Sequence, residues 1–473
     1  MLALRRIINR LSERELNKVK NNWRILAIVP LFTVLLVTLV FAVITYTVDC
    51  PIGDDFEHID ILKKFLEGDI SFFGDIWRQH GDHRPVTMRM VRLLFLGISS
   101  GNPIYENLFS VGVAMVIFLI IAHEVVTSHK SLGLKNFSWV VIFAMVMVFS
   151  PVQFENFLWA HQTSWFVANM AVIVAIFFLG RYPVSLLRYI LAILFSVLAT
   201  YSNGTGLIVW PLGLIAIAIL PAPAPSPKFG KALRIAVWLA SGSICLLAYF
   251  WQYSTISHQP ATKLFLNANL TPFIKYVFGY LGAPMAAGSA FWAIVWGAVA
   301  VSLFLISILC WLINLGTLRD SNGNFMPWFL LGLFSIMNAI LCSLSRIGSG
   351  WDQSLASRYT TVSLLIWISL SVTLNLNIGA NEAFQPKLPE RRQTLLRPDV
   401  MALAAILIMV AISSGYYAMQ AWPSWRNYQN AIRDQMLTGN YDKMAPPQDF
   451  SFLKERDQML KELKLHPFRN QSP

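Results

Sequence analysis

The sequence predicts an all-α protein that crosses a membrane many times. Of its 473 residues, 56% are hydrophobic and only 13% are charged. Soluble domains are about one-quarter charged, so this composition excludes an ordinary soluble fold. Apolar runs long enough to cross a ~30 Å hydrocarbon layer as helices also recur along the whole chain.

We expect about eleven membrane-spanning helices, which together form a transmembrane body at 25–420. The apolar runs that predict them lie at 25–48, 104–127, 136–150, 164–180, 187–201, 206–220, 233–254, 288–314, 325–345, 359–378 and 400–420.

The basic residues predict how this body is oriented. The segment 1–24 carries Arg5, Arg6, Arg10, Arg14, Lys18, Lys20 and Arg24. Positive charge favours the cytoplasmic side, so this segment and the even-numbered connections, which are also basic, should be cytoplasmic. The first connection, 49–103, and a small helical cap at 421–473 should then lie on the non-cytoplasmic face of the cytoplasmic (inner) membrane. A basic patch beside a span indicates topology and lipid contact, so we expect membrane lipids and no nucleic acid as partners.

The first connection opens with DCPIGDDFEHID, which places two carboxylates, Asp54 and Asp55, side by side. The apolar residues that follow recur at helical spacing and predict an amphipathic helix lying along the interface. Both carboxylates could simply cap this helix, where negative charge is favoured. A cap needs only one carboxylate, however, and two adjacent ones repel, so we favour a catalytic pair. Glu57 is expected to be a surface residue.

A second polar cluster follows in DIWRQHGDHRPVTMRMVRLL, at 75–94. The spacing of His80 and His83 would permit a metal site with Asp82 as a third ligand. We favour instead an anion site, in which Arg84 makes bidentate phosphate contacts and His83 adds a titratable donor. An ordinary solvated loop is the remaining alternative.

Other segments predicted on the same face add candidate substrate ligands. PVQFENFLWAHQTSW, at 151–165, places Glu155 and His161 among aromatic rings, which fits a sugar-binding wall or an interfacial aromatic belt equally well. The turn TYSNGTGL contributes Asn203, in irregular backbone that membranes tolerate beside a cavity. SRIGSGWDQSLASRYTT, at 345–361, contributes Arg346, Asp352, Arg358 and Tyr359. An ionisable residue such as Arg358 at the end of a span is a functional candidate by default.

These features together resemble the GT-C superfamily of integral membrane glycosyltransferases, which use polyprenyl-phosphate sugars as donors. The likeness rests on the N-terminal span followed at once by GDDFEHID, on the interfacial helix and on the number of spans. The stretch 54–84 and SRIGSGWDQSLASRY are similar to an uncharacterised bacterial subgroup.

The resemblance implies that Asp54, with Asp55 beside it, is the general base of an inverting transfer. Cations would stabilise the departing phosphate, and the candidates are His83, Arg84, Arg346 and Arg358. Residues left for substrate contacts are His80, Glu155, His161, Asn203, Asp352 and Tyr359. Some relatives also hold a divalent ion, Mg²⁺ or Mn²⁺, at the phosphate. Because the first connection lacks a DxD motif, we assign no metal ligands.

We therefore expect a glycosyltransferase that moves a sugar from a polyprenyl-phosphate donor to a lipid-linked or surface glycan. Two alternatives remain open. One is a polysaccharide polymerase or ligase that uses a pyrophosphate-linked glycan and depends on external Arg residues. The other is a non-enzymatic lipid or glycan transporter, which the absence of matched halves disfavours.

Overall fold

The computed structural model describes residues 28–132, 137–181, 183–220, 230–254, 270–313, 322–382, 398–440 and 450–469. These residues form helices and turns with no β-strand, which confirms the predicted all-α class. The predicted basic segment 1–24 lies outside the described residues.

Eight helices of the described chain are long and apolar enough to cross a membrane. They are Ile28–Tyr46, Ile104–Ser131, Phe137–Leu158, Ala160–Gly180, Lys231–Tyr249, Ala290–Ile313, Phe325–Ser349 and Ser357–Leu376. Two shorter apolar helices, Leu186–Thr200 and Gly204–Ile219, coincide with two further predicted spans. The protein is therefore a multi-pass membrane protein, and the count of eleven stays a prediction.

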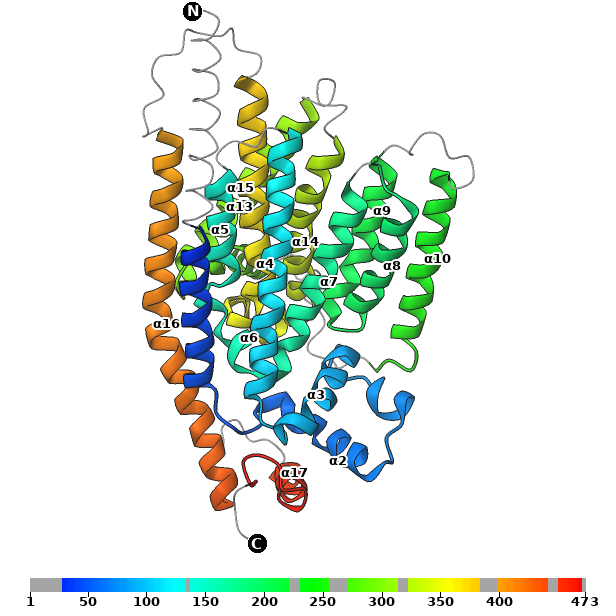
Figure 1. Ribbon diagram of the computed structural model, residues 1–473, viewed down its shortest axis with the longest axis vertical. Helices are drawn as coiled ribbons and strands as arrows, with labels where there is room; N and C mark the ends of the chain where they lie inside the picture. The colour runs from blue at the N-terminus through cyan, green and yellow to red at the C-terminus, as the bar shows by residue number, and fades with distance from the viewer. Residues whose placement is uncertain are drawn as a thin grey trace, which may run out of the picture.

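The helices that build the bundle follow one another in chain order. After the helix Ile28–Tyr46 come α4 (Ile104–Leu132), α5 (Phe137–Val148), α6 (Phe154–Leu158), α7 (Thr163–Gly180), α8 (Leu186–Thr200), α9 (Val209–Ile219), α10 (Lys231–Tyr249), α12 (Thr271–Gly282), α13 (Ala290–Ile313), α14 (Asn322–Arg346), α15 (Thr360–Glu382) and α16 (Pro398–Thr438). Figure 1 shows α8, α9 and α10 on one side of the bundle, and the helix Ile28–Tyr46 with α16 on the other.

Helix α7 lies in the interior of this bundle. It is apolar on all sides, and nearly all of its side chains are buried against α4, α8, α9 and α14. A helix without a polar face is suited to such a position, since every side of it can be covered by other apolar helices.

Helices α12 and α13 cross at very close range because glycines lie at their contact. A Cβ atom at Gly297 would lie 1.8 Å from the carbonyl oxygen of Phe278, and one at Gly282 would lie 1.9 Å from that of Ala293. Small residues allow such backbone approach, which membrane helices use to gain packing contacts in place of hydrophobic driving force.

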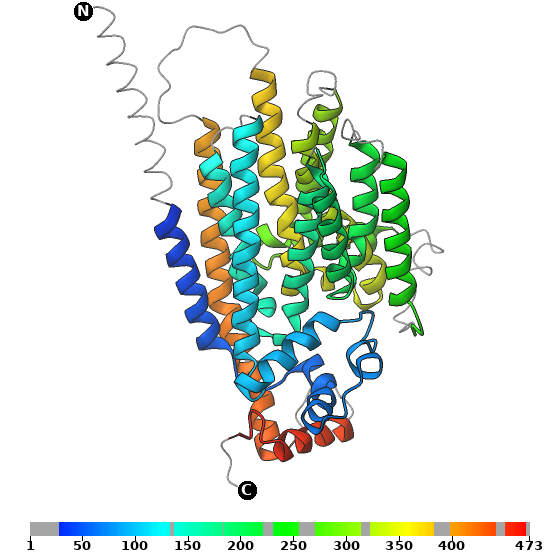
Figure 2. The same cartoon turned by 45° about the vertical axis from the view of Figure 1, so that its right-hand side comes forward.

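A layer of short helices covers one end of the bundle, and we call it the end layer (Figure 2). It consists of η1 (Gly53–His58), α2 (Ile59–Glu67), η2 (Phe72–Ile76), α3 (Val86–Ser99) and α17 (Phe450–Glu462). Helix α2 is the predicted amphipathic helix: it buries Ile59, Ile61 and Leu62 and stops at Gly68, whose φ of 76° ends it in the left-handed conformation.

The predicted helical cap at 421–473 does not begin as a separate unit at residue 421. Helix α16 is continuous from Pro398 to Thr438, so it joins the predicted span 400–420 to the first half of the cap without a break, despite Pro423. Helix α17 then packs on α2, where Arg456 lies 3.9 Å from Asp60. The first connection and the C-terminal helix α17 thus meet in the end layer.

The close contact between α12 and α13 predicts that one added methyl group at Gly297 destabilises the protein. We expect Gly297→Ala to lower the free energy of unfolding by about 1–3 kcal/mol, because α12 and α13 must move apart to admit the Cβ atom. Thermal unfolding of the detergent-solubilised protein measures this. Gly112→Ala, in α4, is the matched control, since a Cβ there meets nothing within 4 Å. Equal stability of the two variants would contradict the interpretation.

Candidate functional site

The turn η1 holds the predicted carboxylate pair against a distant segment of the chain. Gly53 has a φ of +52°, and a Cβ atom there would lie 2.9 Å from the ring of Trp159. The same indole donates its Nε1 hydrogen to the carbonyl of Ile52, at 3.1 Å. The positive φ and the closeness of the indole ring both require a glycine at position 53. The ring contact and the hydrogen bond hold η1 beside the 151–163 segment.

Asp55 points into the protein. Its side chain is only 3% exposed, and its Oδ1 lies 2.5 Å from an amino nitrogen of Arg92, which also pairs with Glu106 at 3.1 Å. Burial disfavours the charge of Arg92, but the two carboxylates outweigh it and hold the pKa of Arg92 above its usual range. Asp55 therefore belongs to a buried ion-pair network that joins η1, α3 and α4.

Asp54, its neighbour, faces the other way. Its side chain is 48% exposed, and Oδ2 lies 3.7 Å from both Nε2 of His80 and Nε2 of His161. Burial opposes its ionisation, but the nearby His80, His161 and Arg358 outweigh this and keep the pKa of Asp54 below its usual range. Of the two predicted catalytic carboxylates, Asp54 is the one that a substrate could reach.

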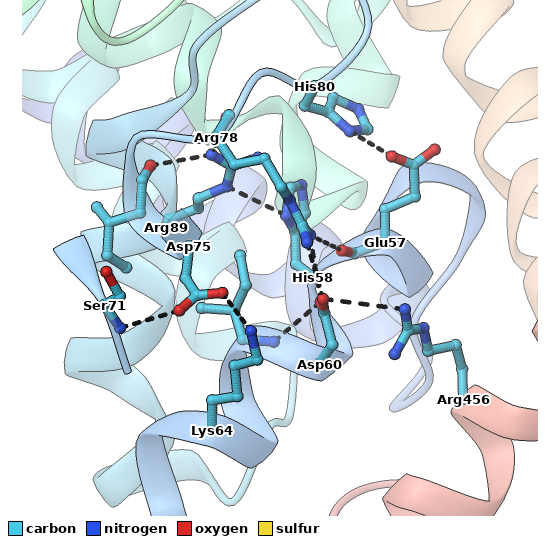
Figure 3. Close-up of polar contacts among 12 residues, drawn as sticks. Glu57, His58, Asp60, Lys64, Ser71, Asp75, Arg78, His80, Arg89 and Arg456 are labelled. Atoms are coloured by element: carbon cyan, nitrogen blue, oxygen red, sulfur yellow. Dashed lines mark hydrogen bonds and ion pairs between the residues drawn. The ribbon is translucent and has the colours of Figure 1, made fainter. Parts of the chain in front are cut away.

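His80 links Asp54 to a third carboxylate. Its Nδ1 hydrogen is donated to Oε2 of Glu57 at 2.7 Å, as Figure 3 shows. Burial works against the imidazolium, but Asp54 and Glu57 stabilise it and raise the pKa of His80 to about 9. Glu57 lies at the surface, as expected, with 54% of its side chain exposed, and it also positions His80.

His58 completes this group of imidazoles and was missed from the sequence. It is 1% exposed, and its ring centre lies 4.9 Å from that of His80 and 5.5 Å from that of His161. Nε of Arg89 approaches its Nδ1 at 3.4 Å (Figure 3). Its nearness to Asp54 in GDDFEHID was the only signal, because its burial depends on His80 and His161, which lie elsewhere in the chain.

Arg358, a predicted phosphate ligand, is close enough to Asp54 for its charge to lower the pKa of that carboxyl. Its guanidinium pairs with Glu155 at 3.2 Å and remains 25% exposed. The backbone nitrogen of Arg358 also donates to Glu155, at 2.8 Å. Glu155, a predicted sugar ligand, therefore orients Arg358.

Arg346 and Asp82 form a separate ion pair at 2.9 Å, with the arginine 29% exposed. His83 is buried, and its Nδ1 lies against Gly204 with no hydrogen-bond partner. Burial, together with the charge of Arg346, lowers the pKa of His83 to about 4. The backbones of His80 and His83 pair through two hydrogen bonds, at 2.8 and 2.9 Å, so His83 adjoins the His80 group while its Nδ1 faces Gly204.

Arg84 is engaged by the backbone of the bundle. It is 4% exposed and donates to the carbonyl oxygens of Tyr249 at 2.5 Å, of Trp77 at 2.8 Å and of Trp251. A phosphate would have to displace these carbonyls. The contacts support a structural role, in which Arg84 fastens the first connection to the end of α10.

Three further predicted substrate ligands are not among the imidazoles and carboxylates around Asp54. Asn203 is buried and caps η5 (Gly204–Ile208) by accepting the backbone hydrogen of Thr205 at 3.1 Å. Asp352 is exposed in η9 (Trp351–Leu355). Tyr359 is buried and stacks on Tyr280, with ring centres 5.4 Å apart.

The donor atoms around Asp54 can be tested against the Mg²⁺ or Mn²⁺ that some GT-C relatives hold. These ions prefer carboxylate, carbonyl and water oxygens. Among the described residues, the group with metal-binding spacing consists of three imidazoles, His58, His80 and His161. Such a set does not fit Mg²⁺ or Mn²⁺, and we assign no step to either ion.

Comparison with protein-family models, with curated proteins and with solved structures found no match to this chain. The assignment of a function therefore rests on the chemistry of the residues around Asp54.

The different surroundings of the two carboxylates predict different effects on stability. We expect Asp55→Asn to lower the free energy of unfolding by about 3 kcal/mol, because it leaves Arg92 buried with one anionic partner fewer. Asp54→Asn, the matched control, should cost less, at most about 1 kcal/mol, because Asp54 is half-exposed and exposed ionic contacts contribute little. Denaturant or thermal unfolding in the same detergent compares them. A greater loss for Asp54→Asn would reverse the assignment.

Proposed function

We propose that this protein is an inverting glycosyltransferase of the GT-C type. It would transfer a sugar from a polyprenyl-phosphate donor to a lipid-linked glycan or another envelope acceptor, on the non-cytoplasmic face of the cytoplasmic membrane. The observation that carries the proposal is Asp54: a half-exposed carboxylate at the end of a membrane bundle, surrounded by imidazoles and close to a partly exposed arginine.

In this mechanism Asp54 accepts the proton of the acceptor hydroxyl. The acceptor oxygen forms a bond to the anomeric carbon as the bond from that carbon to the phosphate oxygen breaks. The products are the new glycoside and the polyprenyl phosphate, which leaves with the bonding electron pair. Because attack and departure occur on opposite faces of the sugar, the anomeric configuration inverts.

The cations near Asp54 suit the phosphate of such a donor. Arg358 is partly exposed, and the imidazolium of His80 is favoured at neutral pH because its pKa is about 9. Positive groups fixed in advance stabilise the charge that develops on a leaving phosphate. They also make Asp54 a weak base in the free protein. A bound phosphate would offset their charge and raise the basicity of Asp54 when both substrates are present.

Replacing the proposed base tests this mechanism. We expect Asp54→Asn to reduce transfer at least ~10²-fold, since an amide cannot accept the proton. The assay uses protein reconstituted in liposomes, a panel of radiolabelled polyprenyl-phosphate hexoses and lipid-linked glycan acceptors.

Asp69→Asn is the matched control for this experiment. Asp69 is an exposed carboxylate of the same connection that lies outside the proposed machinery, so its variant should keep parental activity. If Asp54→Asn retained transfer, the proposed mechanism would have to be abandoned.

The role of Arg358 makes a separate prediction. Arg358→Gln should lower the turnover rate by about 10²–10³-fold, because the leaving phosphate loses its cation. Arg358→Lys keeps the charge and should recover part of that rate. If Gln and Lys variants of equal stability lost the same activity, charge at Arg358 would not be what the reaction needs.

A further inference from the structure

His58, His80 and His161 form a group whose spacing matches that of ligands to one ion. Their ligand atoms all lie within 4.8 Å of one another. The three ring centres are 4.9, 5.0 and 5.5 Å apart. Two imidazoles bound to one zinc ion at 2.0–2.1 Å in tetrahedral geometry would place their ring centres about 5 Å apart.

The carboxylate beside them has matching geometry. Oδ2 of Asp54 lies 3.7 Å from Nε2 of both His80 and His161, which is too long for a good hydrogen bond. Ligand atoms at the corners of a zinc tetrahedron are separated by roughly 3.3 Å. A small inward shift would bring Oδ2 of Asp54 to that separation from each of the two nitrogens.

The group is buried and retains nitrogen atoms without partners. His58, His80 and His161 are 1%, 8% and 6% exposed, respectively. Nε2 of His58 and Nδ1 of His161 have no hydrogen-bond partner in the described structure. A buried polar atom left unpaired costs about 1–3 kcal/mol, and a metal ion at Nε2 of His58 would remove that cost for this atom. In His161 the nitrogen that faces Asp54 is Nε2, so Nδ1 would not be the ligand atom of that ring.

Glu57 accepts the kind of hydrogen bond that a metal-bound histidine usually donates from its non-coordinating nitrogen. By accepting the Nδ1 hydrogen of His80 at 2.7 Å, it leaves Nε2 of that ring to face Asp54. A carboxylate in this position fixes the tautomer and the orientation of a ligating imidazole. Asp54 and Glu57 together also carry two negative charges, which balance a divalent cation.

We propose that Asp54, His80 and His161 bind a zinc-type transition metal ion, with His58 as the fourth ligand. This goes beyond the proposed glycosyl transfer, which would use the metal-free form of the protein. In the zinc-bound form His80 would be neutral and Asp54 would be a ligand, so neither would be free for its role in transfer. Binding by Nε2 of His58 requires its hydrogen to lie on Nδ1. His58 would then give up the 3.4 Å contact from Arg89, which is already longer than a normal hydrogen bond.

Metal content tests this site independently of transfer activity. Full-length protein purified in detergent is stripped with a chelator and titrated with Zn²⁺ against a competing fluorescent chelator. Elemental analysis gives the stoichiometry, and we expect one zinc ion per chain. Co²⁺ should bind in its place and show the visible absorption of a tetrahedral complex, whereas excess Mg²⁺ should not compete.

Variants then locate the ion. His80→Ala and His161→Ala should each weaken zinc binding at least tenfold, and so should His58→Ala if it is the fourth ligand. Glu57→Gln should weaken binding about 10–100-fold without removing a ligand. His123→Ala, at an exposed histidine of α4, is the control and should bind as the parent does. Size-exclusion profiles and helical content show that each variant is folded.

Two results would overturn the proposal: no stoichiometric zinc in the folded parent protein, or parental affinity in folded His80→Ala and His161→Ala. Parental affinity in His58→Ala would overturn the assignment of the fourth ligand. Transfer that depends on Asp54 in a protein that binds no zinc would leave the proposed function standing and remove only the metal site.

Discussion

The buried pairing of Arg92 with Asp55 and Glu106 is the interaction on which the candidate site depends. It joins η1, α3 and the start of α4 through one guanidinium that has almost no contact with solvent. Charges taken out of water are tolerated only when they are paired, so these helices have little freedom to separate. Because Asp54 is the next residue to Asp55, the same pairing determines that Asp54 faces the imidazoles.

Two segments distant in sequence, those around Trp159 and Ser357, are linked to η1 by hydrogen bonds that involve the backbone. Trp159 binds the carbonyl of Ile52, and the backbone nitrogen of Glu155 donates to the hydroxyl of Ser357, at 3.1 Å. His161 and Arg358 are thus brought to the first connection by residues beside them in the chain. Rigid supports of this kind keep charged groups in place before a ligand arrives, which is what electrostatic stabilisation requires.

Composition and apolar run length were enough to predict the all-α membrane fold, because a bilayer imposes helix length and apolarity directly. They also located the connection that carries Asp54. The sequence could not say which of Asp54 and Asp55 is buried, since that depends on Arg92, 37 positions further along the chain. Nor could it show that Arg84 is held by carbonyls of Tyr249 and Trp251, more than 160 positions away. Contacts of such long range leave no local pattern.

The apolar cluster that joins the first connection to α16 and α17 has a consequence for biosynthesis. Ile52 and Phe56, beside Asp54, are buried in a cluster that also contains Met436 of α16 and Leu460 of α17. When the ribosome has delivered the first connection to the membrane, these partners have not yet been made. The apolar side of η1 must therefore stay uncovered until α16 and α17 have been made, so the site around Asp54 matures after the bundle helices that precede them.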